Sequence, residues 1–96
     1  QIQMKTLAVI EKEHVTNLSF SKEEVLKTKE EIKLRSADLH RAQTLGNLLQ
    51  TKVRINFETR DGKIHQVHTT VWAVGTEFIL LKGNKAIPIH CIHSVV

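Results

Sequence analysis

The amino-acid sequence predicts an α+β fold, in which an amphipathic helical segment over residues 21–50 precedes a small five-stranded antiparallel β-barrel over residues 51–96. Two observations predict this class. Apolar residues recur at helical spacing in the first segment, whereas apolar and polar residues alternate between Gly-containing turns in the second. With 96 residues, 41% of them hydrophobic and 25% charged, residues 21–96 are expected to fold as one globular unit.

The barrel is predicted to begin with a hairpin. Residues 53–58 alternate apolar and polar side chains, which is typical of a half-buried strand. Asp61 and Gly62 supply the turn, because glycine adopts positive φ without steric cost. The return strand should span residues 63–74 and is apolar on both faces near its end. We therefore expect it to bend and contribute to two sheets, with Trp72 buried in the core.

Three further strands are predicted to complete the barrel. Residues 78–82 carry an unbroken apolar run and should be buried on both sides. The fourth strand, residues 86–89, contains Pro88, which cannot donate a ladder hydrogen bond and so favours an edge position. Residues 90–93 are predicted to form a single 3₁₀ turn that leads into the last strand. Five short strands with this turn between the fourth and fifth describe an SH3-like or Sm-like barrel.

This order of helix, strand, Asp-Gly turn, long bent strand and short strands resembles the bacterial Sm-like protein Hfq over about the last sixty residues. His90 falls where that family has the His of a Lys-His pair that contacts uridine-rich RNA, and Ile89 stands here in place of the Lys. The resemblance implies an Sm-like barrel and RNA binding. The chain is also similar to a small group of bacterial proteins that share Leu-Gly-Asn, Thr-Thr-Val-Trp-Ala and Ile-Pro-Ile, here residues 45–47, 69–73 and 87–89.

The helical segment is predicted to begin at Lys22. Ser21 and Glu24 have the spacing of a capping box, in which each side chain bonds the other residue's backbone. Phe20 and Val25 have the spacing of a hydrophobic staple, which fixes the entry of the chain into a helix. Together the two patterns predict a helix start at this point.

An apolar stripe follows along the helical segment. Val25, Ile32 and Leu39 recur at seven-residue spacing, and charged residues occupy the opposite side. Ser36 either continues the helix or starts a second one, and Gly46 is predicted to end the helical region. Two interpretations of the stripe stay open: it covers one open end of the barrel, or it pairs with a second copy of the chain.

Residues 1–20 are predicted to be an extension. The apolar run at residues 6–10 is expected to form a strand that either adds to a sheet edge or pairs with residues 14–19. No apolar run approaches the ~20 residues that span a bilayer, and residues 1–10 are too short and polar for a signal peptide. With a single cysteine, Cys91, we expect a cytoplasmic protein without membrane contact.

The His and Cys residues are the obvious candidates for catalysis or metal binding. His65 and His68 lie three residues apart on a predicted strand, so they point to opposite faces and cannot share one ion. His90 and His93 converge only within a helical turn. Cys91 lacks an acid that could orient a His base beside it, because the acids of the barrel lie at predicted turns and strand ends. We therefore expect no catalytic residue, no metal site and no cofactor.

Basic residues favour a binding function. Residues 51–96 hold six Lys and Arg against three Asp and Glu, so most of the net charge of +4 lies on the barrel. The candidate contacts to RNA or single-stranded DNA combine cations with stacking His side chains. They are Arg54, Lys82, Lys85, His90 and His93.

Exposed aromatic residues are scarce, however, since the chain has no Tyr. The sequence therefore predicts a non-enzymatic binding module for protein interaction or self-association, with RNA or single-stranded DNA as the alternative partner. The candidate self-association residues are Val25, Ile32 and Leu39. A protein partner could also add a strand to the edge at residues 86–89.

Overall fold

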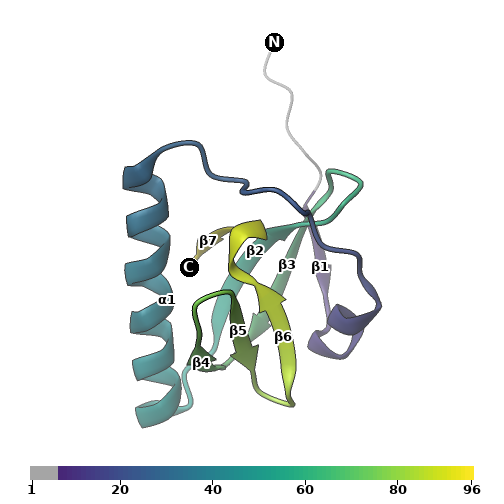
Figure 1. The fold of residues 1–96 in the computed structure, drawn as a ribbon. Coiled ribbons are helices and arrows are strands. Elements are labelled where there is room, and N and C mark those ends of the chain that lie inside the picture. Colours follow the sequence, from purple (N-terminus) through teal and green to yellow (C-terminus); the bar gives the residue numbers. More distant parts are fainter. Residues whose placement is uncertain (1–6) are drawn as a thin grey trace.

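The computed structural model describes residues 7–96, which form one α-helix, two 3₁₀ helices and seven strands in two sheets (Figure 1). The four-stranded sheet has the order β1-β3-β2-β7, with β1 at Leu7–Ile10, β3 at Ile64–Thr69, β2 at Val53–Glu58 and β7 at Ile92–Val95. The three-stranded sheet has the order β4-β5-β6, with β4 at Val71–Val74, β5 at Phe78–Leu81 and β6 at Lys85–Pro88. The helices are η1 at Lys12–Asn17, α1 at Lys29–Leu49 and η2 at Ile89–Cys91. The predicted α+β class is confirmed.

The strands do not close into the predicted five-stranded barrel within these described residues. As predicted, the long return strand bends, because Thr70 separates β3 from β4 and the two strands belong to different sheets. β6 stays at the edge of its sheet. Instead of another strand, η1 packs against both β6 and β3 and buries Val15 completely. Val15 thus contributes to the core beside β6 and β3.

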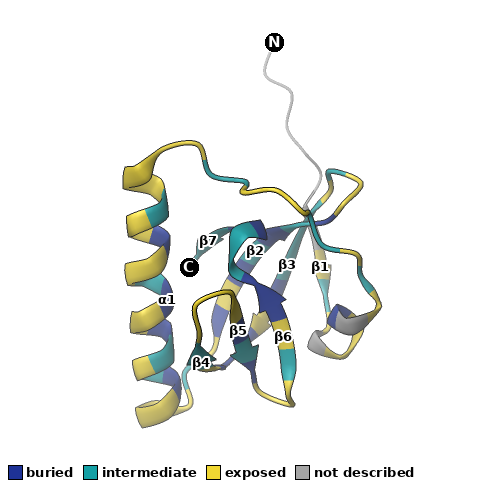
Figure 2. Cartoon of the chain, in the orientation of Figure 1, coloured by how far each residue is buried: buried dark blue, intermediate teal, exposed yellow. Residues whose placement is uncertain are grey.

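The core lies between the two sheets and α1 (Figure 2). Along β2 the side chains alternate as predicted, with Val53, Ile55 and Phe57 buried and Arg54 exposed. The fully or almost fully buried apolar residues come from η1, α1, both sheets and η2. They are Val15, Leu39, Ala42, Val53, Ile55, Phe57, Val67, Val71, Ile79, Leu81, Ile87, Cys91 and Ile92.

The helix begins later than predicted. Its N-cap is Thr28, whose Oγ1 accepts a hydrogen bond from Glu31 N at 3.1 Å, while the Glu31 carboxylate accepts one from Thr28 N at 3.2 Å. This capping box has the same residue pattern as the predicted one at Ser21. The sequence therefore contains two possible helix starts, and α1 begins at the second. Ser36 starts no new helix, because α1 is continuous to Leu49.

The predicted helix stop at Gly46 is also wrong, because this glycine is needed inside α1. A Cβ at Gly46 would lie 2.5 Å from the backbone oxygen of Val71 and 2.9 Å from Cγ2 of Thr70. The absence of a side chain lets α1 approach β4 closely. One turn earlier, Gln43 Oε1 accepts a hydrogen bond from Val74 N at 2.8 Å, so the helix covers the outer edge of β4.

The extension before α1 belongs to the fold. β1 pairs in parallel with β3, which confirms that this strand adds to a sheet edge; residues 1–6 lie outside the described residues. Phe20 then forms an isolated antiparallel bridge with Thr59, and its ring packs on Phe57 with 5.7 Å between centroids. No helix within residues 7–96 is long and apolar enough to cross a membrane.

Candidate interaction surfaces

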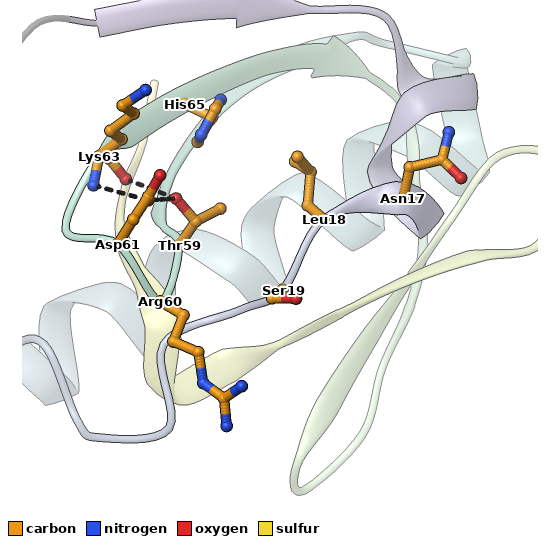
Figure 3. Close-up of a pocket in the computed structure, with 8 residues that line it drawn as sticks. All are labelled: Asn17, Leu18, Ser19, Thr59, Arg60, Asp61, Lys63 and His65. Carbon is orange, nitrogen blue, oxygen red and sulfur yellow. Dashed lines mark hydrogen bonds between the residues drawn. The ribbon is translucent and has the colours of Figure 1, made fainter.

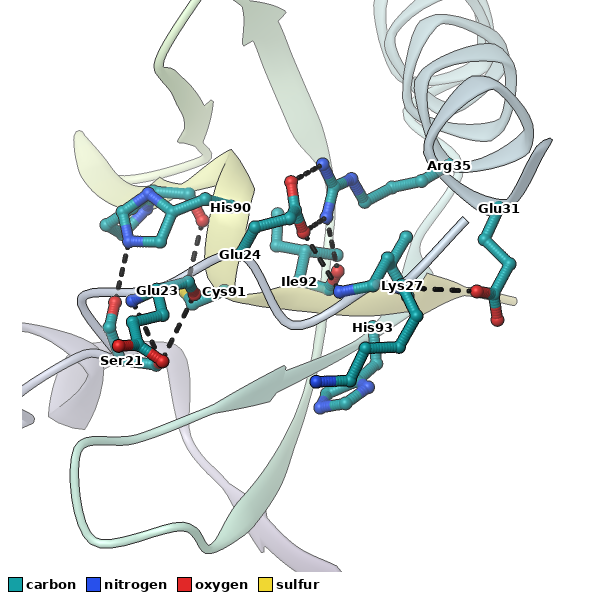
Figure 4. A network of polar contacts seen from close by, with 12 residues as sticks. Ser21, Glu23, Glu24, Lys27, Glu31, Arg35, His90, Cys91, Ile92 and His93 are labelled. Carbon is teal, nitrogen blue, oxygen red and sulfur yellow. Dashed lines mark hydrogen bonds and ion pairs between the residues drawn. The ribbon is translucent and has the colours of Figure 1, made fainter. Parts of the chain in front are cut away.

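A network of polar contacts connects the segment before α1 to α1 itself and to η2 (Figure 4). Arg35 of α1 is almost completely buried, and its two terminal nitrogens donate to the two carboxylate oxygens of Glu24 at 2.7 Å each. Arg35 Nη1 also donates to the backbone oxygen of Ile92 at 3.0 Å. The hydrogen bond from Arg35 lowers the pKa of Glu24 below its ordinary value, because it favours the ionised carboxylate.

The two predicted RNA-contacting histidines belong to the same region. His90 Nε2 lies 2.6 Å from the backbone oxygen of Ser21, and the backbone oxygen of His90 accepts a hydrogen bond from Val25 N at 3.0 Å. His93 Nε2 lies 2.8 Å from Oε1 of Glu58. Both rings therefore have hydrogen-bond partners within the chain, and His90 holds the segment before α1 in place.

The structure does not bring the predicted nucleic-acid residues together. Lys82 directly follows β5 and Lys85 begins β6, whereas His90 and His93 come after the other end of β6. The first and last residues of a four-residue strand lie ~10 Å apart, so the lysines and the histidines lie at opposite ends of β6. Arg54 lies elsewhere, on the exposed face of the four-stranded sheet.

A different basic cluster forms around Arg54. In the β2–β3 register Arg54 is paired with His68, and both side chains are exposed. His68 also lines a cavity of about 330 Å³ together with Lys52 and Lys82. Two acidic residues line the same cavity, Glu11 and Glu13. We define Lys52, Arg54, His68 and Lys82 as the basic cluster. Lys52 was not among the predicted contacts, because it approaches Lys82 only through the bend after β3.

A cavity of about 500 Å³ lies between the end of η1 and the β2–β3 hairpin (Figure 3). The carboxylate of Asp61 is hydrogen-bonded within its own turn. Thr59 Oγ1 donates to it at 2.6 Å and Lys63 N donates to it at 3.3 Å. These hydrogen bonds, above all that from Thr59, lower the pKa of Asp61. Arg60 points away from the other lining residues (Figure 3). The charged groups therefore do not converge on a ligand position.

Cys91 is buried and its Sγ donates to the backbone oxygen of Pro88 at 3.1 Å. Burial raises the pKa of the Cys91 thiol to about 12, so the thiol is protonated at neutral pH and is a poor nucleophile. Over the part of the chain that the structure describes, no three His, Cys, Asp or Glu side chains are grouped so that they could hold a metal ion.

The predicted self-association residues do not share one exposed face. Val25 precedes α1, Ile32 is half-buried, and Leu39 is completely buried in the core. The buried side of α1 comprises Arg35, Leu39, Ala42 and Gly46. This side covers the sheets, and of the predicted stripe only Leu39 belongs to it.

A second stripe of α1 is exposed at Leu34, Arg41 and Leu48 and half-buried at Asp38 and Leu45. Leu34, Asp38, Arg41, Leu45 and Leu48 follow one another at alternating spacings of four and three residues, so they line one flank of the helix. Leu34 is 62% exposed and Leu48 is 74% exposed. Asp38 and Arg41 form an ion pair at the centre. We call these five residues the flank stripe.

An apolar cavity adjoins the flank stripe. It has a volume of about 260 Å³ and lies where α1 meets the ends of β2 and β7. Its lining residues are Asp38, Arg41, Ala42, Leu45, Val53, Val95 and Val96. The flank stripe and this cavity together form a continuous surface with apolar ends and a charged centre.

The outer face of the three-stranded sheet is a further apolar surface. The β4–β5 register shifts between Val71 and Ala73, and this bulge leaves Trp72 37% exposed, so the predicted burial of Trp72 is wrong. Phe78 is 53% exposed, and Ala73, Leu80 and Ala86 are aligned across the three strands.

No family model, no curated protein and no solved structure matches this chain.

Proposed function

We propose that this chain is a non-enzymatic interaction module that associates with a second copy of itself through the flank stripe of α1. The observation that carries the proposal is the exposure of Leu34 and Leu48 on a helix whose other side is already buried. Complete burial of a Leu side chain is worth about 1.5–3 kcal/mol relative to exposure. A helix with two apolar stripes can bury both only when it has two partners, and the sheets supply one.

Part of this proposal is that the two sheets are an open relative of the SH3-like or Sm-like barrel. Two features support this inference. The chain bends between β3 and β4 so that one long segment serves both sheets, and η2 joins the last two strands as a single 3₁₀ turn. The core then acts as a scaffold that holds α1 with its flank exposed.

The mass of the protein in solution tests the proposed self-association. We expect the wild-type chain to sediment as a dimer at high concentration. Leu34→Glu/Leu48→Glu should sediment as a monomer with unchanged thermal stability, because the charges fall on exposed positions. The matched control is Ser36→Glu/Asn47→Glu, which adds two carboxylates at exposed positions of α1 outside the stripe. A wild-type chain that stays monomeric, or a Leu variant that dimerises as well as the control, contradicts the proposal.

RNA or single-stranded DNA binding is a second candidate function, and the basic cluster favours it. Lys52, His68 and Lys82 line one cavity, and Arg54 lies beside His68. Each Lys contact to a phosphate releases about one counterion, which makes binding weaken with salt.

Electrophoretic shifts at several salt concentrations test this candidate. We expect Lys52→Gln/Lys82→Gln to bind mixed RNA and single-stranded DNA more weakly and with a shallower salt dependence than the wild type. Lys63→Gln/Lys85→Gln removes the same charge from outside the basic cluster and should bind as the wild type does. Equal loss in both variants, or no shift by the wild type at low salt, contradicts a nucleic-acid site in the basic cluster.

A further inference from the structure

We infer that the second copy packs antiparallel to α1 about a two-fold axis midway between Asp38 and Arg41, so that each Asp38 faces Arg41 of the other copy. This inference rests on the proposed function and specifies its geometry. It starts from the order of residues in the flank stripe, which reads Leu, Asp, Arg, Leu from Leu34 to Leu45.

Four of the five residues of the flank stripe are self-complementary about this axis, and the fifth, Leu48, faces position 31 of the other copy. The helix rises 1.5 Å per residue, so Asp38 and Arg41 lie ~2 Å on either side of the midpoint and Leu34 and Leu45 lie ~8 Å on either side. In an antiparallel pair, positions at equal distances from the two-fold axis face each other. One axis therefore matches each carboxylate with a guanidinium and each Leu34 with a Leu45.

A parallel pair lacks this match. A two-fold axis that runs along the helices would place Asp38 opposite Asp38 and Arg41 opposite Arg41, so that like charges meet at the centre of the contact. The antiparallel arrangement also sets the two helix dipoles in opposite directions, which is favourable. The pairing of Asp38 with Arg41 and the helix dipoles therefore both favour the antiparallel orientation.

The structure leaves room for this partner. Leu45 lines the apolar cavity next to the stripe, together with Val53 and Val95. Leu34 faces Leu45 in the antiparallel pair, so Leu34 of one copy meets the mouth of this cavity on the other. The Arg41 side chain is 66% exposed and so remains accessible to a second carboxylate.

Charge reversal tests the inference. Asp38→Arg makes both central positions positive and Arg41→Asp makes both negative, so each variant repels its own copy. We expect each variant alone to self-associate at least tenfold more weakly than the wild type in sedimentation. An equal mixture should form heterodimers, because every facing pair then has opposite charges. If Asp38 and Arg41 paired only within one chain, mixing the two variants would not strengthen their association.

Cysteine cross-linking supplies a second measurement that does not depend on charge. Leu34→Cys/Leu45→Cys should form a disulfide dimer on mild oxidation, because the two positions face each other. Leu34→Cys alone should not, since its two copies would lie ~16 Å apart along the helices, beyond disulfide reach. Cross-linking by the single variant would show a parallel pair.

The outcomes separate this inference from the proposed function. A monomeric wild-type chain overturns both. A wild-type dimer that Leu34→Glu/Leu48→Glu dissociates, but whose charge-reversed variants are not rescued by mixing, overturns the antiparallel geometry alone. Heterodimers in the mixture, together with a disulfide only in the double Cys variant, support it.

Discussion

Arg35 and Glu24 lie eleven residues apart in the chain, yet two terminal nitrogens of the Arg donate to the two oxygens of the Glu at 2.7 Å. Arg35 is buried within α1, whereas Glu24 stands in the extended segment before it. In a helix that continued to residue 24, Glu24 would lie eleven residues, or ~16 Å, along the axis from Arg35, which is too far for this ion pair. The pair therefore forms only when the segment before α1 is not helical, which agrees with a helix start after Thr28.

The Glu24 pair makes stability depend on pH. Because Arg35 holds the pKa of Glu24 below its ordinary value of 4.5, the unfolded chain binds this proton more readily than the folded chain. The stabilisation is complete above pH 4.5 and is lost as the pH falls through the lowered pKa of the folded state. We expect urea midpoints of the wild type to fall over this acidic range more steeply than those of Glu24→Gln.

Glu31 and Asp61, whose pKa values are also lowered, remain in both proteins and serve as an internal control. Wild-type and Glu24→Gln midpoints that fall in parallel would mean that Glu24 contributes nothing to the acid sensitivity.

Gly46→Ala should destabilise the protein although Ala is the better helix former. The added Cβ would lie 2.5 Å from the backbone oxygen of Val71, so α1 must move away from β4. Overpacking of this kind costs ~1–3 kcal/mol, against a gain in helix propensity of ~1 kcal/mol. Urea unfolding measures the difference. Asn47→Ala, at an exposed neighbouring position, is the control and should lose nothing.

If Gly46→Ala raised the free energy of unfolding instead, α1 would not approach β4 as closely as the structure has it.

Trp72→Ala should cost less than a core substitution, because the ring is 37% exposed. We expect a loss of ~1–2 kcal/mol in the free energy of unfolding from the apolar area that remains buried. Ile79→Ala is the matched comparison in the neighbouring strand. Ile79 is completely buried, so its truncation should cost ~2–5 kcal/mol. Chemical denaturation of both variants shows which one loses more free energy of unfolding. A larger loss for Trp72→Ala than for Ile79→Ala would place the Trp72 ring in the core.

Strand positions could be predicted because they depend on local patterns. The alternation in β2 and the bend between β3 and β4 are visible in successive residues. The orientation of Trp72 could not be predicted, because it depends on a bulge that reverses the alternation between β4 and β5. The burial of Val15 could not be predicted either, since η1 carries no apolar period and is placed by contacts with β3 and β6.

The candidate self-association surface depended on where α1 begins. A helix that starts at Lys22 contains Val25, Ile32 and Leu39 on one apolar stripe, which is predicted either to cover the barrel or to pair with a second copy. Once the sheets bury Leu39, the uncovered stripe lies about 100° around the helix, through Leu34 and Leu48. Residues distant in sequence thus decided which side of α1 faces the solvent.

The parallel pairing of β1 with β3 affects the order in which the chain can fold during synthesis. β1 is synthesised before the other described strands, but its partner in the register, Ile64 opposite Leu7, is made more than fifty residues later. Contacts so far apart in sequence form slowly, because a long loop must close before they contribute. The β2–β3 hairpin can form from neighbouring residues as soon as it emerges. We therefore expect β1 and η1 to dock onto a hairpin already made, so that a segment synthesised before the hairpin is placed after it.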